Sequence, residues 1–91
     1  MPAKAPDPGE VAAARLQDLG ERIRAHRKRH KINATTAAEA AGMSRVTLHR
    51  IERGEPSVAM GAYMSAITTM GLELELVDAL VATVGGGRPL V

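Results

Sequence analysis

The stretch AEAAGMSRVTLHRIERG, residues 38–54, decides the fold. It opens with small residues that favour a helix, and Gly42 then suits the left-handed conformation that ends one. Ser44 is a good N-cap for a second helix over residues 45–53, in which Leu48 and Ile51 share one face. The stretch therefore predicts two helices joined by a short glycine turn, with the polar and basic side of the second helix facing outward.

On the N-terminal side, residues 7–10 (DPGE) read as a helix start with Asp7 as N-cap and Pro8 at the first helical position. Residues 18–21 (DLGE) repeat this start signal inside a continuous apolar stripe, so residues 8–30 form either one helix or two. Asn33 then caps the helix that precedes Gly42, and Ala38 and Ala41 are small enough to let the next helix cross closely.

On the C-terminal side, a fourth helix is expected before Gly71, with an apolar stripe of Met60, Tyr63 or Met64, Ile67 and Met70. The following residues 72–77, LELELV, alternate as a half-buried strand does, although Leu and Glu would also suit a frayed helix end. One strand cannot satisfy its own backbone groups, so this segment is expected to pair with a second copy of the chain or with a partner protein.

These elements predict an all-α fold of four to five helices, with one short C-terminal β-strand that pairs across a dimer. The expected boundaries are a disordered tail over 1–7, a helical domain over 8–70, a strand and dimerisation segment over 71–84, and a flexible tail over 85–91. Leu72, Leu74 and Leu76 are the expected dimer contacts. A chain of 91 residues with one Tyr and no Phe or Trp has a thin core, which a partner chain would help to complete.

Charge is concentrated in the middle of the sequence. Residues 20–53 hold nine Lys or Arg and three Glu, a net charge of +6, whereas residues 54–91 hold one Arg and four acidic residues, a net charge of −3. A basic patch on a small domain favours polyanionic partners, and a merely solvated charged face is the alternative. The chain has no cysteine and no long apolar run, which leads us to expect a soluble cytoplasmic protein.

Residues 19–56 resemble the Cro/C1-type (Xre-like) helix-turn-helix family, most specifically in the stretch quoted above. The resemblance implies that the helix after Gly42 lies in the major groove of double-stranded DNA. It places Ser44, Arg45, Val46, His49 and Arg50 at base edges, and Asn33, Ala34, Thr47 and Arg53 near phosphates. It also implies an ion pair between Arg27 and Glu52. The family usually has glutamine where this chain has Ala34, so a phosphate contact there would depend on backbone N–H groups.

The segment from Met60 to Ala79 is similar to the C-terminal part of HipB-type antitoxins. This similarity implies a dimeric repressor of its own operon that also binds a HipA-like toxin kinase. A stand-alone Xre-like regulator, and a protein-binding adaptor that has lost DNA affinity, are the alternatives. A homodimer would favour a near-palindromic operator.

Enzymatic and metal chemistry find little support in the sequence. His26 and His30 are four residues apart, the spacing of two metal ligands on one helix face, but no third ligand and no accompanying Glu of a zinc-protease motif is evident. No catalytic triad or phosphate-binding loop appears either. The expectation is a protein that is not an enzyme and has neither a cofactor nor a metal site.

Overall fold

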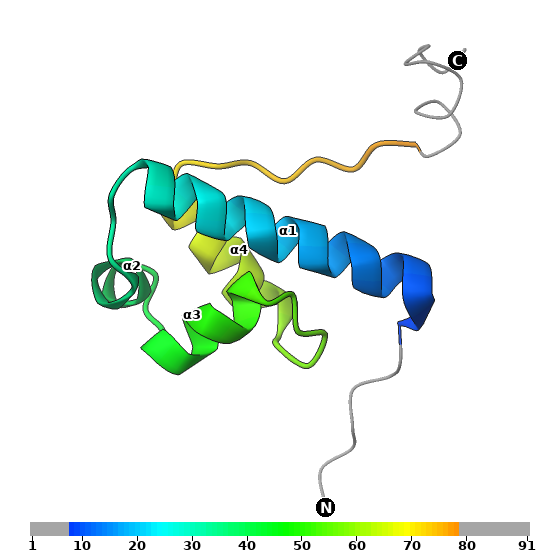
Figure 1. Ribbon diagram of the computed structural model, residues 1–91, viewed down its shortest axis with the longest axis horizontal. Helices are drawn as coiled ribbons and strands as arrows, with labels where there is room; N and C mark the ends of the chain where they lie inside the picture. The colour runs from blue at the N-terminus through cyan, green and yellow to red at the C-terminus, as the bar shows by residue number, and fades with distance from the viewer. Residues whose placement is uncertain (1–7, 79–91) are drawn as a thin grey trace, which may run out of the picture.

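The structure is a computed structural model that describes residues 8–78 of the chain. The described part contains four helices and no strand: α1 (Gly9–Arg29), α2 (Ala34–Ala40), α3 (Arg45–Glu52) and α4 (Met60–Thr69). The long α1 lies across the shorter helices, as Figure 1 shows. Helix α3 packs against all three of the others, so its position is set from several sides.

Residues 9–29 form one continuous helix, which resolves the choice between one helix and two. The helix begins at Gly9, directly after Pro8, and Asp7 lies outside the described residues. Gly20 is therefore an interior helix residue and not part of a second start. A Cβ atom at Gly20 would lie 2.5 Å from the Ile51 carbonyl oxygen and 2.7 Å from that of Glu52. Glycine at this position lets α1 and the end of α3 touch backbone to backbone.

The helix boundaries around the turn follow from local hydrogen bonds. The two expected N-caps are confirmed, because Asn33 Oδ1 accepts from the Thr36 N–H at 2.8 Å and Ser44 Oγ accepts from the Thr47 N–H at 3.0 Å. Helix α2 ends where Gly42 adopts a φ of 71° and the Met43 N–H donates to the Ala38 carbonyl at 2.9 Å. This closed turn points α3 away from α2 at a defined angle.

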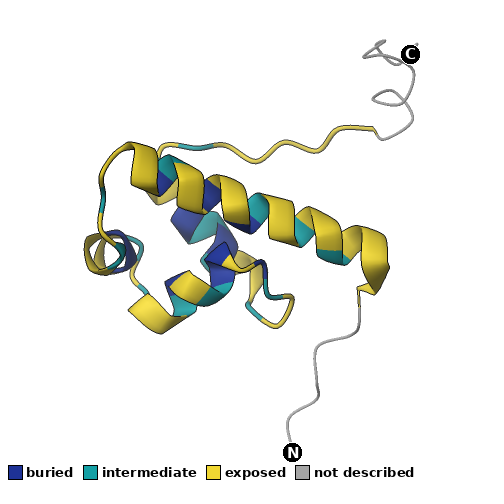
Figure 2. Ribbon diagram, in the orientation of Figure 1, coloured by how far each residue is buried: buried dark blue, intermediate teal, exposed yellow. Residues whose placement is uncertain are grey.

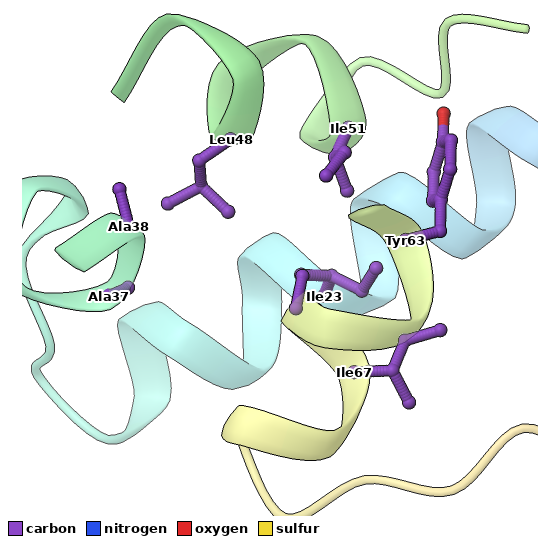
Figure 3. Packing of buried hydrophobic residues seen from close by; sticks show 8 residues of the cluster. Ile23, Ala37, Ala38, Leu48, Ile51, Tyr63 and Ile67 are labelled. Carbon is purple, nitrogen blue, oxygen red and sulfur yellow. The ribbon is translucent and has the colours of Figure 1, made fainter. Parts of the chain in front are cut away.

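The core lies where the four helices meet. Its large buried members are Ile23, Leu48, Ile51, Tyr63 and Ile67, and Figure 3 shows the helices that carry them close to one another. Alanines complete the core, which lets the helices approach closely. The buried pair on α2 is Ala37 and Ala38, whereas Ala41 is half-buried. The expectation for Met60 is wrong: it is 61% exposed at the start of α4, and Ala66 takes the buried place on that helix.

The expected C-terminal strand is not formed in the described part of the chain. Residues 72–78 leave α4 without regular secondary structure, drawn as the extended trace after α4 in Figure 1. Leu72 is half-buried against the core, but Leu74 is 38% exposed and Leu76 is 99% exposed. A strand needs a neighbouring strand to complete its hydrogen-bond ladder, and residues 8–78 contain no other strand that could pair with this segment. The predicted tails 1–7 and 85–91, and residues 79–84 of the predicted dimer segment, lie outside the described residues.

Candidate nucleic-acid interface

The first turn of α3 is the most exposed part of the expected DNA-binding face. Leu48 and Ile51 are completely buried and hold α3 on the core, which leaves Arg45, Val46 and His49 on the outside. Val46 is 68% exposed, so its methyl groups are accessible at the start of α3. In the ribbon of Figure 2 the start of α3 is coloured as exposed. The arrangement can present cationic, imidazole and methyl groups together to a partner.

The start of α3 is fixed by its cap. The Ser44 hydroxyl accepts from the Thr47 N–H and also donates to Thr47 Oγ1 at 3.0 Å. Because its hydrogen is already donated, the Ser44 hydroxyl retains mainly acceptor capacity toward a ligand. Thr47 is half-buried beside it. At the start of α2, Asn33 uses its side chain as a cap and is exposed, while Ala34 is half-buried.

Arg50 differs from the other expected base contacts. Its Nε donates to Glu55 Oε1 at 2.9 Å and its Nη2 donates to Ser57 Oγ at 2.6 Å, so the guanidinium is directed toward the loop that follows α3. Arg53 donates from Nε and Nη2 to Glu55 Oε2 at 3.1 and 2.8 Å. Hydrogen bonds from Arg50 and then from Arg53 hold the pKa of the Glu55 carboxyl below its usual value. These bonds engage two of the five N–H groups of the Arg50 guanidinium, so the loop competes with DNA for this side chain.

The loop between α3 and α4 is tied down from its other side as well. Tyr63 is buried, and its hydroxyl donates to the Glu55 carbonyl at 2.8 Å. Burial, followed by the nearby Glu55 charge, raises the pKa of the Tyr63 hydroxyl. Gly54 opens this loop with a φ of 72°, and a Cβ there would collide with the α1 backbone at Leu16 and Gln17. Glu55 was not foreseen as a structural residue, although an acid directly after a helix ending in arginines is a readable signal.

Arg27 and Glu52 form a buried ion pair beneath α3. Arg27 Nε donates to Glu52 Oε2 at 2.7 Å and Nη2 donates to Oε1 at 3.0 Å, the two-pronged geometry that suits a guanidinium and a carboxylate. A third bond, from Arg27 Nη1 to the Ile32 carbonyl at 2.9 Å, reaches the turn before α2. The hydrogen bonds to Glu52 raise the pKa of Arg27. The pair thereby ties α1, α3 and the α1–α2 turn together.

His26 and His30, which have the spacing of metal ligands, do not lie in a cluster of metal-binding side chains within the described residues. The rings of His26 and His30 lie 4.3 Å apart, and His26 Nε2 makes a hydrogen bond with the Met70 carbonyl at 2.9 Å. Within residues 8–78, no group of three or more His, Cys, Asp or Glu side chains gathers as a metal site would require. Among the same residues, no helix is both long enough and apolar enough to span a membrane.

A second basic surface adjoins α3 and was not predicted. An open concavity of about 400 Å³ separates the last turns of α1 from α3, and its lining consists of Arg24, Arg27, Lys28, His49, Glu52 and Arg53. Arg24 and Lys28 are one helical turn apart and both exposed. Their spacing is visible in the sequence, but the fact that they face α3 is not.

Helix α3 is anchored on the core by its inner face, and its exposed first turn follows the glycine turn that ends α2. This arrangement defines a helix-turn-helix module of the kind that binds DNA. Comparison with family models matches residues 18–80 to a helix-turn-helix domain. The chain therefore belongs to the helix-turn-helix domain family, of the Xre/Cro-like kind. A search of curated proteins found no match to the chain.

Proposed function

We propose that the chain is a sequence-specific transcriptional repressor that reads DNA with α3. The observation that supports this proposal best is the exposed set of Arg45, Val46 and His49 on a helix whose other side is fixed to the core. A rigid helix with an exposed first turn has the dimensions to enter the major groove. Belonging to a DNA-binding family supports the same conclusion.

Each side chain has a distinct role in this proposal. Arg45 binds guanine through its two-pronged donor group, a contact worth about 1 to 3 kcal/mol, and Val46 packs on a thymine methyl. Ser44 and His49 contact neighbouring base edges. Arg50 reads a base with the guanidinium N–H groups that Glu55 and Ser57 leave free. Four further residues contact phosphates of the DNA backbone in this proposal: Asn33, Ala34, Thr47 and Arg53.

The repressor acts as a dimer through Leu72, Leu74 and Leu76. The exposure of Leu74 and Leu76 in the single chain leaves apolar surface that a second copy would bury, and pairing would satisfy the backbone of this segment. Two α3 helices would then enter successive major grooves about 34 Å apart, so the operator is a near-palindrome.

A role as a HipB-like antitoxin is the more particular form of this proposal. It is supported by the similarity of residues 60–79 to such antitoxins and by Leu74, Leu76 and Val77, which are exposed together. A HipA-like kinase encoded beside this chain should co-purify with it. A genomic neighbourhood without such a kinase would leave the stand-alone regulator.

Selection of bound duplexes from a random library tests the DNA claim directly. The wild type should enrich one near-palindromic sequence, and Arg45→Ala should lose discrimination at one position of each half-site. Arg15→Ala, an exposed change on α1, is the matched control and should leave the selected sequence unchanged. Leu74→Asp should reduce the dimer in solution and weaken operator binding. Failure of the wild type to bind any duplex at low salt would instead support the adaptor.

A further inference from the structure

The concavity between α1 and α3 has walls and a floor of different character. Its floor is the Arg27–Glu52 pair, both partners of which are buried and bonded to each other. Its α1 wall consists of Arg24 and Lys28, which are exposed and have no ion-pair partner within residues 8–78. The charge available to a ligand therefore comes from the walls and not from the floor.

The α3 wall of the concavity is continuous with the proposed base-reading face. His49 and Arg53 line the concavity and also belong to the outer side of α3. A duplex whose major groove holds α3 must place one of its strands beside that helix. The cations of α1 then lie next to the same backbone, because the concavity joins the two helices.

We propose that Arg24 and Lys28 of α1 bind neighbouring phosphates of the DNA strand that borders the groove occupied by α3. This proposal rests on the proposed function and extends the DNA surface to a helix outside the helix-turn-helix pair. The two residues are four apart, so their attachment points rise by about 6 Å along the helix. Long cationic side chains at that separation can each take one phosphate of a continuous backbone.

The shape of the site favours a strand over a small free anion. A pocket for a free anion would offer buried donors that have no protein partner, but every buried side-chain nitrogen or oxygen in residues 8–78 has one. The concavity is instead open, with its free cations at the rim. A polyanion lying across the rim can contact both cations without entering the floor.

The salt dependence of duplex binding tests the proposal. The double variant Arg24→Gln/Lys28→Gln is compared with Arg15→Gln/Arg22→Gln, which removes the same charge from the side of α1 that carries Asp18. Fluorescence anisotropy against a selected operator and an unrelated duplex gives the affinity across a range of salt concentrations. Thermal melting followed by circular dichroism verifies that both variants fold.

We expect the Arg24/Lys28 variant to reduce the steepness of the slope of log affinity against log salt by about 1.8, since each lost phosphate contact contributes about 0.9 to that slope. Its affinity should fall by the same factor for both duplexes, because phosphate contacts carry no sequence information. The Arg15/Arg22 variant should change the slope much less.

Three results would overturn the proposal in distinguishable ways. If the two double variants had equal slopes while Arg45→Ala still lost discrimination, the α1 phosphate contacts would be refuted. The proposed function would be unaffected by that result. Absence of wild-type binding to any duplex would remove the proposed function and this extension together. Chemical-shift changes at Arg24 and Lys28 on adding pyrophosphate, with an unaltered duplex slope, would assign the concavity to a free anion.

Discussion

Replacing Gly20 with alanine tests whether the contact between α1 and α3 depends on a missing side chain. In an exposed helix, glycine to alanine stabilises by about 0.5 to 1 kcal/mol. At Gly20 the new Cβ would lie 2.5 Å from a backbone carbonyl of α3, whereas ordinary contact begins at 3.4 Å. Because the obstacle is backbone, α3 itself must withdraw, and overpacking of this kind costs about 1 to 3 kcal/mol. We expect Gly20→Ala to lose about 2 kcal/mol in the free energy of unfolding.

Gly61→Ala is the matched control for this experiment. Gly61 is also helical, in α4, but a Cβ there meets nothing within 4 Å. The Gly61→Ala substitution should therefore stabilise the protein by about 0.5 to 1 kcal/mol. Urea unfolding followed by far-ultraviolet circular dichroism, at one protein concentration, measures both variants. A Gly20→Ala protein as stable as the wild type would refute the backbone contact. DNA affinity should also fall in Gly20→Ala, since α3 is displaced.

Three further outcomes follow from the hydrogen bonds around α3. The carboxyl of Glu55 should titrate by NMR with a pKa below the ordinary value of a glutamate side chain, and Arg50→Gln should raise that pKa. The stabilisation from its bonds is then present above the ordinary pKa and is lost as pH falls through the lowered one; an unchanged pKa in the variant would contradict this. Arg27→Met should cost about 3 kcal/mol by leaving Glu52 buried alone, and Arg27→Met/Glu52→Leu should recover most of it; equal stability of the two variants would argue against an isolated buried charge. Tyr63→Phe should cost about 1 kcal/mol in urea unfolding, whereas no loss would mean that the bond to the Glu55 carbonyl is not stabilising.

The turn between α2 and α3 could be predicted because its signals are local. Asn33 and Ser44 cap helices through bonds to residues three positions away, and the left-handed turn at Gly42 involves only its neighbours. The inward positions Leu48 and Ile51 follow from helical periodicity alone. These same rules placed Arg45, Val46 and His49 on the outer face, where the structure has them.

The direction of Arg50 could not be predicted in this way. Periodicity places it on the outer face, but the loop after α3 folds back so that Glu55 and Ser57 take its guanidinium. The absence of the expected strand over residues 72–77 has a related cause. Its alternation of Leu and Glu is plain in the sequence, but pairing depends on a second set of backbone groups.

The sequence by itself determined the helices, their caps and the outward side of α3, because these depend on interactions between residues a few positions apart. The tertiary structure decided why α1 needs glycine at residue 20, which partners Arg50 takes, and that Arg24 and Lys28 face α3. These features arise where segments far apart in the chain meet, as Gly20 and Ile51 do. Their geometry is set by the packing of whole helices, which no local pattern of residues encodes.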